Sequence, residues 1–309
     1  PVASGSRRTW SWSLGPIPAL AREESLPPLW SCVPAVAFSA GGWTGFAQSV
    51  LNPMAEIARS APRARAKARE LAAAAGTDEV ARVRAIRDHV ARAVRLAGPS
   101  FDDLPLSVLS PPDRTLEEGY GHGRDRAVLL YAMLEEIGFQ PAFLLAAARG
   151  ARHEGLRSLW SDCPQLGVFD SVLVRVAAGG RTIFLNDTDQ YAEPGVSYYD
   201  GRPALDRTGQ IRSLAVDAPY RERVETDYTV QVQPDGTARI GVQVQFFGTR
   251  QAAFHRDLVR QTPEERRRFA QETAAAISQA AQLEGELEVE ADRYPGTLRY
   301  TVTVPRFAV

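Results

Sequence analysis

The sequence has few of the residues that most often build metal sites or disulfide frameworks. Its 309 residues include only two cysteines, Cys32 and Cys163, and only four histidines. Two cysteines cannot supply a multi-disulfide framework or a four-cysteine zinc set, although one bridge between them stays open as an alternative. The histidines are scattered without the spacing of metal ligands. We therefore expect no metal ion and no other cofactor.

Lysine and long apolar runs are scarce as well. Lys67 is the only lysine among the 36 basic residues, and the formal net charge is −1. Without a basic run or a basic balance there is no electrostatic case for nucleic-acid binding. No stretch approaches the ~18 consecutive apolar residues of a membrane-spanning helix. The sequence thus predicts no transmembrane segment.

The remaining composition is that of a globular protein, with 44% apolar and 24% charged residues. The length is enough for two domains and a fragment of a third. Residues 1–42 are rich in proline, serine and tryptophan, with a strand expected at 7–13, which predicts an extended connection to a neighbouring domain. Residues 43–221 mix helical and strand patterns, and residues 222–309 are strand-rich. We predict an α+β protein in which a helix packs on an antiparallel sheet, followed by a β-rich C-terminal domain with at least one helix.

Helical patterns dominate the first half of the second region. A helical pattern runs from Trp43 to about Ala75, and Asn52-Pro53 should kink it or start a new helix. Thr77 is the expected N-cap of the next helix, whose valines and Ile86 recur every three or four residues until it ends near Gly98. A proline-rich loop at 98–120, a helix at 124–137, a strand at 141–147 and a polar loop at 148–166 should follow.

Strand patterns dominate the rest. Strands are expected at 168–176 and 181–186, joined by a turn with two glycines, and residues 187–221 should wrap the sheet. Residues 224–232 and 238–247 alternate around Pro234-Asp235-Gly236, which predicts a hairpin. Thr262-Pro263-Glu264-Glu265 is a capping box that should open a helix to about Ala281. The last strands are expected at 283–291 and 297–304, and outer strands here would need cover.

The most informative stretch is Gly121-His122-Gly123-Arg124-Asp125-Arg126-Ala127, which opens an apolar helical run. It resembles the segment Gly-Asp-Cys-Lys-Asp-Lys-Ala of the transglutaminase-like superfamily, whose cysteine position falls on Gly123. A cysteine at the start of a helix is stabilised as the thiolate by free N–H groups and the helix dipole. Glycine has no side chain that could act as a nucleophile.

The same resemblance supplies two further landmarks. Phe169-Asp170-Ser171-Val172 matches a strand that reads Phe-Asn-His-Val in the family, which places Ser171 at the position of the histidine base. Leu185-Asn186-Asp187-Thr188 matches Leu-Asp-Pro-Thr, which places Asn186 at the position of the aspartate. The resemblance implies a papain-like transglutaminase core at 43–221, the end of a β-rich domain at 1–42 and another β-rich domain at 222–309. It also implies a catalytic triad that is degenerate at all three positions.

Four polar residues beside these positions are candidates for a binding cleft. His122 and Arg124 flank Gly123, Asp170 precedes Ser171, and Asp187 follows Asn186. Two of them also have a simpler interpretation: His122 as an exposed loop histidine, and Arg124, like Asp125 and Arg126, as an anchor of the helix start.

The hypothesis that follows is a catalytically inactive protein, a pseudoenzyme, that binds a protein or peptide or serves as a scaffold. A purely architectural role is equally compatible. The enzyme alternative is a cysteine hydrolase or amide-forming enzyme in which Cys163 or His122 finds a partner; Ser171 has no identifiable base. Since the chain begins at Pro1 and the family's proteins are often exported, we expect part of a longer precursor and an extracytoplasmic location, periplasmic or at the cell surface.

Overall fold

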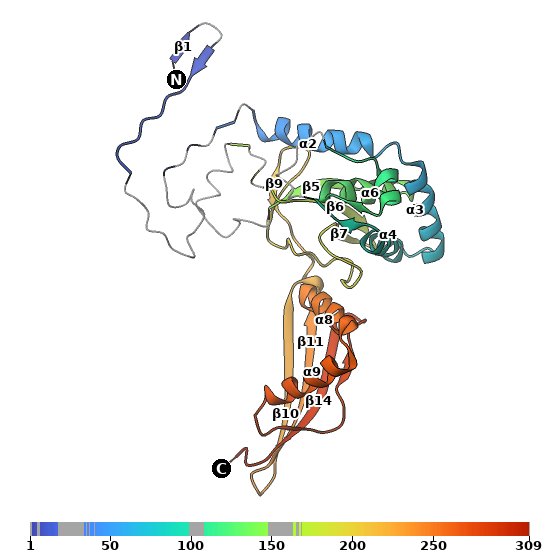
Figure 1. The fold of residues 1–309 in the computed structure, drawn as a ribbon, viewed down its shortest axis with the longest axis vertical. Helices are drawn as coiled ribbons and strands as arrows, with labels where there is room; N and C mark the ends of the chain where they lie inside the picture. The colour runs from blue at the N-terminus through green and yellow to red at the C-terminus, as the bar shows by residue number, and fades with distance from the viewer. Residues whose placement is uncertain are drawn as a thin grey trace. The chain divides into compact units, whose positions relative to one another are not determined.

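The structure, a computed structural model, describes residues 2–4, 7–17, 34, 36, 38–39, 41–98, 108–147, 163–164, 167 and 169–308. It consists of two compact units, residues 1–37 and 38–309 (Figure 1). In the first unit, β1 (Val2–Ser4) pairs antiparallel with β2 (Arg7–Thr9), so the strand expected at 7–13 is shorter than predicted. Cys32, His153 and most of the polar loop at 148–166 lie outside the described residues.

The second unit begins with helices whose boundaries differ from the predicted ones. Helix α2 (Trp43–Ile57) continues through Pro53, and the break falls at residues 58–61, before α3 (Pro62–Ala75). Pro62 opens that helix because a first-turn residue has no intrahelical hydrogen bond to lose. Helix α4 (Glu79–Ala93) is capped by Asp78, whose carboxylate accepts the Ala81 N–H at 2.6 Å. The prediction of Thr77 as the cap is therefore wrong by one residue.

Helix α4 ends at Ala93 rather than near Gly98, where the sequence predicted its end. The helix stops early because the residues after it pair with a strand that is distant in the sequence. Strand β3 (Arg95–Leu96) pairs in parallel with β4 (Tyr120–Gly121). The Arg95 N–H donates to the Gly119 carbonyl at 2.8 Å, and the Ala97 N–H to the Gly121 carbonyl at 3.0 Å. Helix α5 (Pro112–Glu118) occupies part of the stretch expected as a loop.

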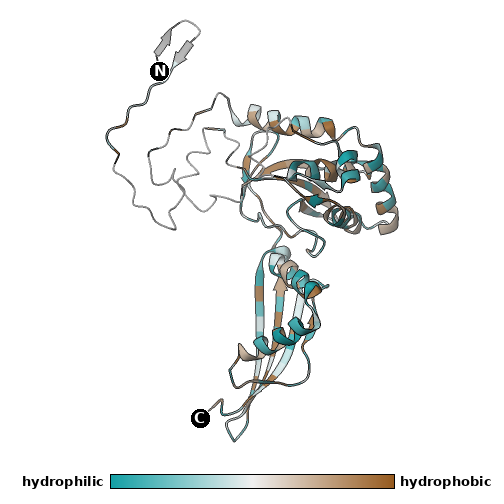
Figure 2. Ribbon diagram, viewed as in Figure 1, coloured by the Kyte–Doolittle hydropathy of each residue, from teal (hydrophilic) through white to brown (hydrophobic). Residues whose placement is uncertain are grey.

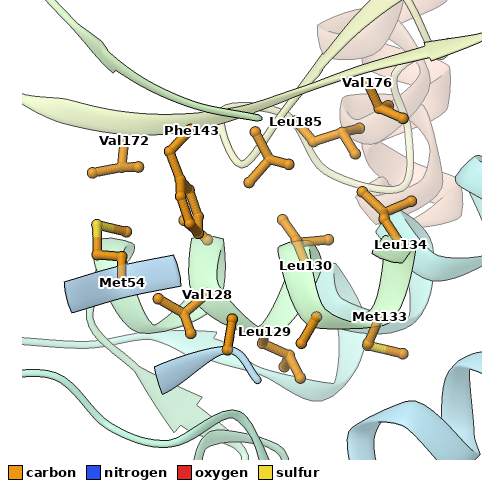
Figure 3. Close-up of a cluster of buried hydrophobic side chains, with 14 of the residues drawn as sticks. Met54, Val128, Leu129, Leu130, Met133, Leu134, Phe143, Val172, Val176 and Leu185 are labelled. Carbon is orange, nitrogen blue, oxygen red and sulfur yellow. The ribbon is translucent and has the colours of Figure 1, made fainter. Parts of the chain in front are cut away.

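The centre of this unit is α6 (Gly123–Glu136) packed on an antiparallel sheet. The strand order is β7-β6-β5-β8-β9, with β5 at Ala142–Ala146, β6 at Ser171–Ala178 and β7 at Arg181–Leu185. Figure 3 shows Leu130 and Leu134 pointing toward these strands, whereas Leu129 and Met133 point away from them. Helix α6 is therefore apolar on opposite sides, as a helix covered on both sides must be. The predicted α+β class is confirmed.

Two strands of this sheet lie in the segment expected to wrap it. They are β8 (Pro203–Leu205), which pairs with β5, and β9 (Ile211–Ser213), which pairs with β8. Each has three residues, too few for an alternating pattern to stand out in the sequence. The predicted hairpin of β6 and β7 is present with Gly179 and Gly180 at its turn.

A second antiparallel sheet forms the C-terminal part, in the order β10-β11-β14-β12, with β13 also paired to β14. The predicted hairpin is present as β10 (Arg223–Val232) and β11 (Ala238–Phe247), which pair antiparallel from Arg223 opposite Phe247 to Val232 opposite Ala238. Strand β14 spans Gly296–Val304, and β12 (Gln282–Leu283) and β13 (Glu288–Glu290) are short. Helices α8 (Gly248–Arg260) and α9 (Pro263–Ala275) accompany this sheet, and α9 is mostly hydrophilic (Figure 2). Within the described residues, no helix has the length and apolar character needed to span a membrane.

Candidate functional site

The start of α6, where the resemblance places a nucleophile, is held by a reciprocal cap. The buried His122 is the N-cap residue, and its Nδ1 accepts the Arg124 N–H at 3.3 Å. In return, Asp125 Oδ2 accepts the His122 N–H at 3.1 Å, and Asp125 Oδ1 accepts the Ser110 N–H at 2.8 Å. His122 therefore satisfies one of the free N–H groups of the helix end, that of Arg124. Nδ1 of this imidazole is thus occupied as the acceptor of the cap.

The space above Gly123 is open as far as the described residues show. A Cβ atom built on Gly123 would meet only Leu96 Cδ1, at 3.9 Å, which is ordinary van der Waals contact. Leu96 is 62% exposed, and Tyr120, on the paired strand β4, is 51% exposed. The helix N-terminus is thus bordered by one exposed apolar side chain, that of Leu96, which is suited to contact with another molecule. Tyr120 pairs with Arg95 rather than with Leu96, so it lies on the other face of this strand pair.

Asn186 lies against Gly123 and connects the helix to the sheet. Its Nδ2 donates to the Gly123 carbonyl at 2.8 Å and to the Val172 carbonyl at 2.7 Å. The backbone of Asn186 has a φ of 86°, in the left-handed region that asparagine tolerates better than most residues. Its Oδ1 is buried without a hydrogen-bond partner among the described residues. The amide therefore holds α6 on β6, with both N–H groups engaged by backbone carbonyls.

Ser171 occupies a different environment. On β6, Val172 packs in the same cluster as α6, whereas Leu173 packs in a second cluster with Leu144 and Ala146. Ser171 pairs with Ala146, and paired residues share one face of a sheet. Ser171 therefore belongs to the face turned away from α6, where it hydrogen-bonds the Tyr199 hydroxyl. The structure brings Gly123 and Asn186 into contact and directs the Ser171 side chain elsewhere.

The two candidate aspartates are both engaged by neighbours. Asp170 Oδ1 accepts the Tyr199 hydroxyl at 3.1 Å, and the pKa of Tyr199 is raised, chiefly by burial. Asp187 Oδ2 accepts the Ser197 hydroxyl at 2.6 Å and the Tyr198 N–H at 2.8 Å. Burial raises the pKa of Asp187 to about 6, although these hydrogen bonds oppose the shift. Both aspartates thus position the loop after β7.

Arginines surround this loop, and their importance was not predicted from the sequence. Arg87, on α4 and 2% exposed, donates to the Ala192 carbonyl at 2.6 Å, to Thr188 Oγ1 at 3.3 Å and to Asp88 at 2.7 Å. The sequence does contain a signal for the burial of Arg87. This residue lies four residues after Val83 and three before Val90, on the apolar stripe of the helix. A charged residue on such a stripe indicates a buried partner.

Two further arginines stand on α6 itself. Arg124 is 1% exposed, so it lies inside the protein rather than on an open surface. Burial lowers the pKa of both Arg124 and Arg126, and Asp189 opposes the shift at Arg126. Asp189 also accepts a hydrogen bond from Arg256 of α8 at 2.7 Å. The loop after β7 is therefore tied to helices that are far apart in the sequence.

Of the other described titratable candidates, none comes within 4 Å of a Cβ atom built on Gly123. Cys163 is a buried free cysteine without a hydrogen bond among the described residues. His89 has a lowered pKa because of burial, and the ring of His255 meets Tyr191 edge-on at 5.1 Å. Within the part of the chain that the structure describes, no three His, Cys, Asp or Glu side chains are grouped as a cation site would require.

No protein-family model matches the chain, and no curated protein matches it. A solved structure from Parabacteroides distasonis, provisionally described as a protease, is similar at a TM-score of 0.42 and 11% identity. The match covers 85% of this chain and 52% of that one, so the chain spans about half the length of that protein. At this similarity, neither a family nor an activity follows.

Proposed function

We propose that this chain is a catalytically inactive member of the transglutaminase-like superfamily that binds a peptide segment at the start of α6. The observation that carries the proposal is the environment of Gly123. It stands at a capped helix N-terminus, its Cβ position meets only Leu96 Cδ1 among the described residues, and its carbonyl is held by Asn186. A thiolate at this position would be favoured by the helix, but glycine supplies none.

Inactivity is further supported by the positions of the other residues that could serve as a nucleophile or a base. Acyl transfer needs a nucleophile within hydrogen-bonding reach of a base. His122 is engaged in capping, and Ser171 bonds Tyr199 on the other face of the sheet. Cys163 is a buried free cysteine, and no base among the described residues is hydrogen-bonded to it. Among the described residues, no hydrogen bond joins Cys163 or Ser171 to a histidine, which supports inactivity over the enzyme alternative.

Peptide binding is supported by the border of the open space. Leu96 is apolar and 62% exposed, and its Cδ1 lies 3.9 Å from the Cβ position of Gly123. Glycine at position 123 lets a ligand approach the backbone closely, because no Cβ atom intervenes. An extended segment with an apolar side chain is the ligand that this border fits, which favours binding over a purely architectural role.

Inactivity is tested by assaying the protein with casein and a dansylated amine, and with fluorogenic peptide amides. We expect no turnover above buffer for the wild-type protein or for Cys163→Ser. Turnover that Cys163→Ser abolishes would refute the proposal and support the enzyme alternative. The Gly123→Cys variant should be alkylated readily by iodoacetamide, within about tenfold of the rate of a cysteine placed at Gly45. Gly45 lies in the first turn of α2 and has equally open space at its Cβ position.

Peptide binding is tested by selecting displayed random peptides on the immobilised protein. Peptides enriched on the wild-type protein should be lost on Leu96→Asp, which places a charge beside Gly123. They should be retained on Val259→Asp, since Val259 is similarly exposed, at 55%, and lies on α8. The absence of enrichment, or enrichment that Leu96→Asp leaves unchanged, would refute binding at this site.

A further inference from the structure

Strand β10 forms an edge of the C-terminal sheet and is exposed along nearly its whole length. It pairs with β11 on one side, and no described strand pairs with its other side. Figure 1 shows it as a long strand at the margin of this sheet. Every residue from 224 to 232 is exposed, and the strand contains neither proline nor lysine, the residues that commonly protect an edge. Its outward-facing backbone groups are therefore available for another strand.

One face of β10 is apolar, although it is exposed. The side chains that alternate along this face include Val224, Tyr228, Val230 and Val232, which are 47%, 60%, 48% and 53% exposed. The last three pair with Val242, Ile240 and Ala238 of β11, which are buried in the cluster that includes Ala274 of α9. The apolar face of this sheet is thus buried against α9 at β11, whereas it is exposed at the edge strand β10.

We propose that this edge pairs with β10 of a second copy of the chain, antiparallel and with Tyr228 opposite Tyr228 of the partner subunit. In this register every residue from 224 to 232 has a partner on the same face of the sheet. Val224 faces the partner's Val232, and Thr226 faces the partner's Val230. The two sheets then form one continuous sheet with a continuous apolar face, which two-fold symmetry permits with a single surface patch.

The acidic residues Glu225 and Asp227, on the opposite face of β10, favour this register over registers shifted along the strand. Glu225 then faces the partner's Gln231, and Asp227 faces the partner's Thr229, so no like charges are opposed. A shift that centres on Asp227 would set two aspartates directly opposite each other, which is destabilising. A further shift by the same step would oppose Glu225 and the partner's Asp227. Shifts in the other direction avoid this repulsion, but they shorten the overlap and leave apolar residues unpaired.

The test is the mass of the full chain in solution, measured by sedimentation equilibrium from about 1 μM to about 1 mM, the range of weak to moderate association. The expected mass rises with concentration from that of one chain to that of two. Tyr228→Asp and Tyr228→Lys should each weaken association at least about tenfold, since each opposes like charges at the centre. An equimolar mixture of the two variants should associate again. Leu96→Asp, a similarly exposed position on β3, should associate like the wild-type protein.

Cross-linking tests the register independently of affinity. Under mild oxidation Tyr228→Cys should form a disulfide between two copies, because paired residues lie within the Cα separation that a disulfide requires. Val232→Cys should not, because it faces the partner's Val224, and the wild-type protein controls for its own cysteines. The proposal is overturned by a single-chain mass at every concentration, by dimers that persist in both charge variants, or by Val232→Cys cross-linking as readily as Tyr228→Cys. Unchanged thermal midpoints for the variants will show that they remain folded.

Discussion

The substitution Asn186→Asp would restore the residue that the transglutaminase-like resemblance implies at this position, and we expect it to destabilise the protein. Nδ2 of Asn186 donates to two backbone carbonyls, at 2.8 and 2.7 Å. An ionised aspartate would place a second acceptor oxygen there, so both hydrogen bonds would be lost. Each contributes about 1 kcal/mol, and an unsatisfied buried charge adds roughly 1–3 kcal/mol more. The expected loss at pH 8 is therefore about 3–5 kcal/mol.

The loss should depend on pH with a defined sign. Burial and the opposed carbonyls disfavour the charged carboxylate, so the pKa of the introduced carboxyl in the folded variant should lie above its unfolded value. The folded variant then binds more protons than the unfolded chain, and its stability falls as pH rises through the folded pKa. Below that pKa the protonated carboxyl can donate a hydrogen bond to one of the two carbonyls. This hydrogen bond restores part of the lost unfolding free energy.

Urea denaturation with linear extrapolation at pH 5 and pH 8 measures these free energies. Asn186→Gly is the matched control, because glycine keeps the φ of 86° and loses only the two hydrogen bonds, about 2 kcal/mol. Asn186→Ala should lose about 1 kcal/mol more, since a Cβ atom is strained at this φ. If Asn186→Asp stays within about 0.5 kcal/mol of the wild-type protein at pH 8, the amide does not hold α6 on the sheet as argued.

Two predictions concern the loop after β7. Because the folded pKa of Asp187, about 6, lies above its usual 3.8, its contribution to stability is present below pH 4 and lost as pH rises through 6. Asp187→Asn should abolish this dependence, so the difference in unfolding free energy between the two proteins should change by about 2 kcal/mol from pH 4 to pH 7; a constant difference would contradict the assignment. Arg87→Met should cost about 3–5 kcal/mol by urea denaturation, because Asp88 and the Ala192 carbonyl lose a buried partner. A cost below about 1 kcal/mol would mean that Arg87 does not anchor the loop.

Elements governed by neighbouring residues were predictable. The capping box at Thr262 opens α9 where expected, with Glu265 accepting the Thr262 N–H at 2.7 Å. The hairpin of β10 and β11 follows from alternation around Pro234-Asp235-Gly236. These signals reside within a few residues of chain, where spacing alone fixes which groups meet.

Elements that depend on distant partners were not predictable. The helical pattern toward Gly98 is interrupted because Arg95–Leu96 pairs with Tyr120–Gly121, and nothing near residue 95 indicates this partner. The three-residue strands β8 and β9 are defined by pairing with β5 and with each other. A strand so short has little pattern of its own, so only the completed sheet identifies it.

The same distinction between local and long-range interactions applies to the candidate site. The sequence by itself determined that position 123 carries no nucleophile and that it opens an apolar helix, because both are properties of the local chain. Only the tertiary structure decided that Asn186 donates to Gly123 and Val172, that Ser171 faces Tyr199, and that Arg87 holds the loop after β7. These contacts join residues that are far apart along the chain, and each depends on which face of a strand or helix a side chain occupies. Those faces are fixed by strand register and helix packing.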